Sequence, residues 1–173
     1  MTTASTNEAT PTRRVWLCIF LGIIATIELV DALASIQTIF AHRETGAGPP
    51  SFAQTLNDIR LALTPLIVAA AFIFAAIGDI RRAVLAMAVF TLMAWLLDGL
   101  PTIALHGMTF SFDYGGLEAV FLYVITPIAA LAAGALALTN RRLGLAALLV
   151  SLSTLFRWIG LVIFIIAVVK YGF

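Results

Sequence analysis

Four ionisable side chains lie inside long apolar stretches of this 173-residue chain, namely Glu28, Asp31, Asp98 and Arg157. A charged residue at the centre of a lipid bilayer costs roughly 2.5–3.5 kcal/mol on the mildest scale, so such residues face each other or water and mark proton and ion pathways by default. The carboxylates would bind a proton or a cation, and the guanidinium would supply the counter-charge. These residues predict a polar layer inside a helical bundle, with Arg157 in ion-pair reach of at least one acid.

The four residues lie at one depth if each apolar stretch is a helix. A rise of ~1.5 Å per residue places all of them about 18–23 Å from the arginine-bearing end of their helices. Other polar side chains share their faces at steps of three and four residues, which is the helical repeat. The three polar stripes are Glu28, Asp31, Ser35 and Thr38; Thr91, Trp95, Asp98 and Thr102; and Ser153, Thr154, Arg157 and Gly160.

The charges of this layer do not balance, because three acids accompany one arginine. At least one carboxyl group is left without a permanent cation, so it would be protonated or would hold a cation. This imbalance favours a small transporter or channel-type protein. A structural interpretation stays open beside it, since polar contacts commonly hold helices together in membrane proteins.

Further candidates for the same site lie within the layer or close to it. Trp95 and Trp158 fall in the layer, where an indole N–H needs a partner and the ring can lie over a cation. Glu118 and Arg60 lie nearer the outer interface, and Asp58 is the expected partner of Arg60.

Long apolar stretches must position these residues. The chain is 62% apolar and 11% charged, whereas soluble domains are about 45–50% apolar and about 25% charged. Each stretch reaches the ~20 residues that a helix needs to cross a bilayer, and such continuous runs exclude barrel strands. The sequence predicts an all-α membrane protein, a bundle of five transmembrane helices at about 15–40, 59–80, 83–105, 117–139 and 143–169.

Arginine pairs set the expected orientation, since basic residues near short loops mark the cytoplasmic side. All of the pairs fall on one side if the chain crosses five times, which predicts a cytoplasmic N-terminus and an outer C-terminus in the cell (inner) membrane. The pairs are Arg13-Arg14, Arg81-Arg82 and Arg141-Arg142.

Residues 1–12 are expected to be a disordered cytoplasmic tail, because they are small, polar and without apolar periodicity. Residues 13–173 then form a single transmembrane domain. A cleaved signal within residues 1–34 is the alternative, although Glu28 and Asp31 interrupt the purely apolar region that a signal requires.

Two local patterns bear on helix packing. Ser51 followed by Gln54 is a capping-box pattern, so the second helix should begin near Phe52. Ala130 and Gly134 have the spacing of small residues that allow close helix approach. That approach is expected either within the bundle or in a homo- or hetero-oligomer.

Several chemistries are excluded by residue type and spacing. His42 and His106 fall in expected outer loops, so a haem held between two histidines within the membrane is excluded. Zinc-ligand spacing and phosphate or dinucleotide loops are missing, and the single cysteine, Cys18, cannot form an intramolecular disulfide. We therefore expect no cofactor, no metal and no nucleic-acid partner.

Three function classes remain, all with the lipid bilayer as the surroundings. The first is a transporter or channel-type protein with an acidic proton or cation site. The alternative is a non-catalytic accessory or scaffold subunit whose polar layer is structural. An intramembrane enzyme or lipid-headgroup binder comes third, because no nucleophile is paired with a base.

Overall fold

The computed structural model describes residues 11–44, 52–107 and 114–172, and within these ranges it contains helices and no strand. Two of the helices are interrupted by a five-residue π-helical segment, labelled η. The elements are α1 Pro11–Glu44, α2 Phe52–Ala76, α3 Ile80–Ala94, η1 Trp95–Gly99, α4 Leu100–His106, α5 Tyr114–Val120, η2 Phe121–Ile125, α6 Thr126–Leu138, α7 Leu143–Val150 and α8 Leu152–Tyr171.

Five of these helices are long and apolar enough to cross a membrane, which confirms the predicted all-α class and the predicted number of apolar helices. Elements α3, η1 and α4 run on as one helix, and so do α5, η2 and α6. The candidate spans are Pro11–Ile36, Gln54–Ala76, Ile80–Leu105, Gly116–Leu138 and Leu152–Tyr171.

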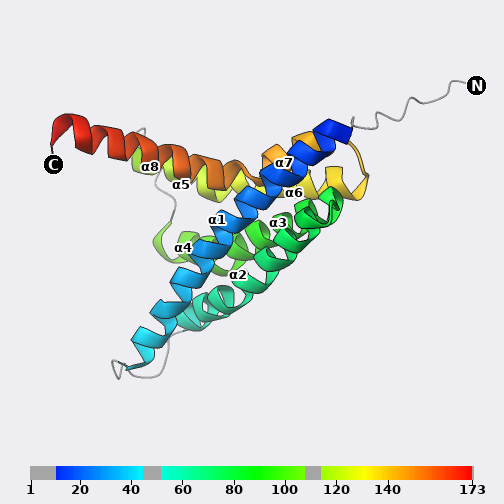
Figure 1. Ribbon diagram of the computed structural model, residues 1–173. Coiled ribbons are helices and arrows are strands. Elements are labelled where there is room, and N and C mark those ends of the chain that lie inside the picture. Colours follow the sequence, from blue (N-terminus) through cyan, green and yellow to red (C-terminus); the bar gives the residue numbers. More distant parts are fainter. Residues whose placement is uncertain (1–10, 45–51, 108–113, 173) are drawn as a thin grey trace, which may run out of the picture.

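The fifth predicted span, 143–169, is wrong as a single helix, because the chain bends at Ser151. The buried hydroxyl of Ser151 donates a 2.8 Å hydrogen bond to the carbonyl of Ala147, a contact that often bends helices. At this residue the stretch is divided into α7 and α8, and α8 alone is the candidate span. Figure 1 shows α8 and α1 diverging from a common region near α7.

Other boundaries differ by a few residues. Helix α1 begins at Pro11, inside the predicted tail, and continues to Glu44. His42 is therefore helical, and His106 is the last residue of α4, so neither lies in the expected loop. Helix α2 begins at Phe52, as predicted. The proposed capping residue Ser51 and residues 1–10 lie outside the described ranges.

The core of the bundle is built largely from small side chains where α6 meets α3 and α7. Ala133 and Ala137 are fully buried there, together with Ala146. Ala130 is buried too, and a methyl group added at Gly134 would lie 3.9 Å from the side chain of Ala88 on α3. The close helix approach predicted at Ala130 and Gly134 therefore occurs within the chain.

Helix turns and arginines meet at one end of the bundle, where the start of α1, the α2–α3 turn and the α6–α7 turn lie together (Figure 1). Gly78 and Asn140 take positive φ angles of 82° and 53° there, and such left-handed residues end helices. Arg81 Nη2 donates to the carbonyl of Leu138 at 3.2 Å. An arginine beside the α2–α3 turn therefore binds the last carbonyl of α6, next to the α6–α7 turn. The three arginine pairs consequently share one end.

Candidate functional site

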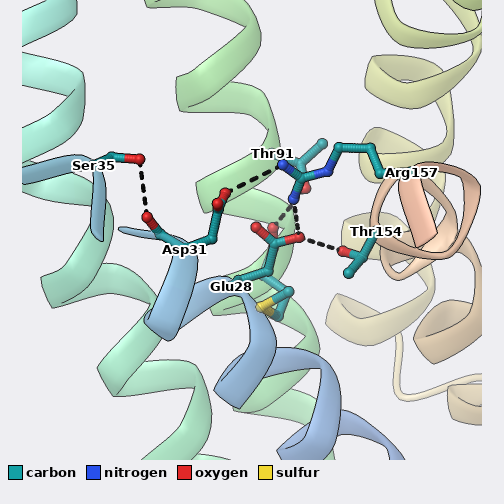
Figure 2. Close-up of polar contacts among 7 residues, drawn as sticks. Glu28, Asp31, Ser35, Thr91, Thr154 and Arg157 are labelled. Carbon is teal, nitrogen blue, oxygen red and sulfur yellow. Dashed lines mark hydrogen bonds and ion pairs between the residues drawn. The ribbon is translucent and has the colours of Figure 1, made fainter. Parts of the chain in front are cut away.

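Glu28 is the buried centre of the site, with 3% of its surface exposed in the middle of α1. Two donors from α8 converge on its Oε1 atom (Figure 2). Arg157 Nη2 forms an ion pair with it at 2.6 Å, and Thr154 Oγ1 donates a hydrogen bond at 2.6 Å. Because Thr154 and Arg157 are three residues apart, one helical face supplies both donors.

Asp31 forms the outer edge of this cluster, one turn further along α1. Its Oδ2 atom accepts a 3.3 Å contact from Arg157 Nη1, so one guanidinium lies between two carboxylates (Figure 2). The side chains of Asp31 and Arg157 are 61% and 46% exposed, and exposed ion pairs add little stability. The contact of Arg157 with Glu28 is therefore the shorter and more buried of the two, while the carboxylate of Asp31 is exposed.

The predicted pairing of Arg157 with at least one acid is confirmed by both contacts. Thr91 of α3 lies beside this group in Figure 2, but its hydroxyl donates within its own helix to Met87 at 3.0 Å. No buried side-chain nitrogen or oxygen of the described residues lacks a hydrogen-bond partner. The inner half of the cluster is thus fully satisfied.

Asp98 does not join the cluster, so the structure unites three of the four residues of the predicted layer. It lies exposed in η1, and its carboxylate has no ion-pair or hydrogen-bonding partner in the described part of the chain. Only its backbone carbonyl is used, as the acceptor of a 2.7 Å bond from Thr102. Asp98 is therefore an unpaired acid in the middle of an apolar helix.

Trp95 finds the hydrogen-bond partner that its indole N–H was expected to need. Its Nε1 donates a 2.9 Å hydrogen bond to the carbonyl of Tyr123 in η2. Tyr123 lies four residues before Pro127, and proline has no N–H to donate to that carbonyl. The indole thus replaces the missing helical donor and links the two π-helical segments.

Gly99 allows these two segments to approach closely. A methyl group at this residue would lie 3.1 Å from Trp95 Cδ1 and 3.2 Å from Tyr123 Cδ1, closer than ordinary side-chain contacts. Both segments also precede a proline, Pro101 after η1 and Pro127 after η2. π-Helical segments occur frequently at functional sites, and here one of them carries Asp98.

The remaining predicted residues lie apart from the cluster. Arg60 Nη2 donates to Asn57 Oδ1 at 2.9 Å, so the side chain of Arg60 pairs with Asn57 and not with the predicted Asp58. Glu118 is half-buried on α5, and Trp158 is exposed on α8; neither has a polar partner or ring contact among the described residues. Thr154 was predicted only as part of a stripe, although its spacing from Arg157 was the signal for its role.

An aromatic stack joins η2 to α8. The rings of Phe121 in η2 and Phe156 in α8 are 4.0 Å apart between centroids, which places an apolar contact next in sequence to Arg157.

Among the residues described, no group of three or more metal-ligating side chains occurs. No protein-family model, curated protein or solved structure matches the chain.

Proposed function

We propose that this chain is a multi-pass membrane protein of the transport or channel type, with an acidic site that binds a proton or a small cation. The five apolar helices support the membrane placement. The gathering of the arginine pairs at one end supports a cytoplasmic N-terminus, and a fifth crossing then puts the C-terminus outside in the cell (inner) membrane.

The observation that carries the proposal is the charge balance of the three acids, Glu28, Asp31 and Asp98, against Arg157. Arg157 serves both Glu28 and Asp31, and Asp98 has no partner among the described residues. Two negative charges are therefore left uncompensated within apolar helices. Each would cost about 2.5–3.5 kcal/mol at mid-membrane depth, so protonation, hydration or a bound cation must offset them. In this proposal Glu28 anchors α8, while Asp31 and Asp98 exchange the proton or cation.

A second candidate is the non-catalytic accessory or scaffold subunit. This candidate is supported by the exposure of α8. Only 6% of the most apolar stretch of α8 is buried inside the bundle, whereas the other candidate spans have 28–33% of theirs buried. A partner helix could pack on that surface, and the satisfied Glu28 would then serve only as a structural ion pair.

The decisive experiment measures flux in liposomes that contain the purified full-length chain. An internal pH-sensitive dye reports proton movement, and sodium or potassium gradients test cations. We expect Asp31→Asn and Asp98→Asn each to lower the flux at least tenfold. Asp58→Asn is the matched control, because it makes the same change outside the site, and it should retain wild-type flux.

The alternatives give distinct results in the same assay. Wild-type flux in the double Asn variant would contradict the proposed site. A wild-type chain that moves neither protons nor cations, and in which the two Asn variants change only thermal stability, would support the accessory subunit and contradict transport.

A further inference from the structure

Two open grooves flank α1 at the arginine end. One lies between α1 and α2, with a volume of about 570 Å³, and its lining includes Arg14, Val15 and Cys18 from α1 and Phe72 and Ile77 from α2. Most of its surface is apolar. It has the character of a slot for a hydrocarbon chain with one guanidinium in its lining.

The second groove lies on the other side of α1, against α7. It also measures about 570 Å³, and its lining includes Arg13, Trp16 and Phe20 from α1 and Leu145 and Leu148 from α7. Consecutive residues on a helix point about 100° apart, since one turn takes 3.6 residues. Arg13 and Arg14 therefore supply one guanidinium to each groove.

Neither of these two arginines has an ion-pair or hydrogen-bonding partner within the described ranges. Six arginines gather at this end, whereas Asp79 is the one acid there among the described residues, and it already pairs with Arg82 at 3.3 Å. Arg81 donates a hydrogen bond to the carbonyl of Leu138. The positive charge beside the grooves is consequently free to bind an anion.

We propose that each groove binds one anionic phospholipid, with its phosphate on Arg13 or Arg14 and an acyl chain along the apolar floor. Basic pockets between helices at the cytoplasmic face suit anionic headgroups, and the apolar floors favour a lipid over free phosphate. This inference rests on the proposed membrane placement of the arginine end and does not depend on transport.

Native mass spectrometry of the full-length chain in detergent, titrated with phosphatidylglycerol, tests the proposal. We expect two tightly bound lipids in the wild type. Arg13→Gln and Arg14→Gln should each weaken one of them about fivefold, the effect of one basic residue near a membrane surface. Arg141→Gln is the matched control, because it removes the same charge at the same end but lines neither groove.

A second variant tests the groove rather than the charge. Ala76 is an exposed residue of the α1–α2 groove, so Ala76→Phe should fill that slot, leave the core intact and remove one bound lipid. Phosphatidylcholine should bind more weakly than phosphatidylglycerol, and millimolar inorganic phosphate should displace neither lipid. Displacement by phosphate would instead identify a simple anion site.

Two results would overturn the proposal. The first is unchanged binding in the Arg13→Gln, Arg14→Gln double variant, and the second is an equal loss in Arg141→Gln, which would indicate a diffuse basic surface. A chain that binds the two lipids but supports no flux would contradict only the transport function.

Discussion

At the residue scale, one guanidinium connects the first helix of the chain to the last. Glu28 is buried and receives both Arg157 and Thr154, whereas Asp31 is accessible. The two acids are only three residues apart on α1, yet they differ in environment. Glu28 is therefore held by two partners in the interior, whereas Asp31 makes one longer contact at the exposed edge.

Arg157→Met should destabilise the protein, because it leaves the buried carboxylate of Glu28 without a counter-charge. Breaking a fully buried pair costs about 3–5 kcal/mol, and the partial exposure of Arg157 lowers the expected loss to about 1–3 kcal/mol. Thermal unfolding in detergent, followed by tryptophan fluorescence, measures the loss. The double variant Glu28→Gln, Arg157→Met should be more stable than Arg157→Met alone. If the two single losses simply add, Glu28 is not stranded and the ion-pair interpretation is wrong.

The sequence predicted the core of this cluster because the cost of an unpaired charge leaves few arrangements open. Glu28, Asp31 and Arg157 had to meet charges or water, and they meet each other. Asp98 shared their predicted depth but not their contacts, since depth along a helix does not fix the direction in which a side chain points. Side-chain direction also explains why Arg60 pairs with Asn57 and not with Asp58. Residues three apart share a helical face, and residues two apart do not.

At the scale of elements, the Trp95–Tyr123 hydrogen bond holds two interrupted helices together. Trp95→Phe should leave the carbonyl of Tyr123 without a donor, at a cost of about 1–3 kcal/mol. The control is the Pro127→Ala background, in which residue 127 regains an N–H for that carbonyl. There Trp95→Phe should cost distinctly less, as measured by thermal unfolding in detergent. Equal losses in both backgrounds would show that the indole matters through packing alone.

Hydropathy located the five apolar helices, but it could not locate the bend at Ser151. Residues 143–169 form one continuous apolar run without glycine or proline near that position. Ser151 donates to the carbonyl four residues earlier, yet Thr64 and Thr91 make the same bond in helices that continue beyond them. The bend therefore depends on packing around the buried Ser151, which a local pattern does not record. Hydropathy could not predict the π-helical segments either, although Pro101 and Pro127 lie just after them in the sequence.

At the scale of the whole molecule, charge is distributed by end. The arginine pairs share one end, and the chain terminates at the far end of α8 (Figure 1). In a Cys18→Ala background, a cysteine at Tyr171 should react with an impermeant thiol reagent added outside intact cells. A cysteine at Asn140, in the turn between α6 and α7, should react only after the membrane is opened. The reverse labelling would overturn the orientation proposed from the arginine pairs.

The ion pair between α1 and α8 also has a consequence for the order of assembly during synthesis. Glu28 and Arg157 are 129 residues apart, and a ribosome adding about 5–20 residues per second needs roughly 6–26 s to supply the second after the first. In the proposed membrane placement Glu28 has no counter-charge of its own during that interval, so the first helix would be hydrated or sheltered by the insertion machinery until α8 is made. A nascent chain released before α8 would carry a stranded acid in its first helix. The absence of this contact would thereby distinguish an unfinished chain from a finished one.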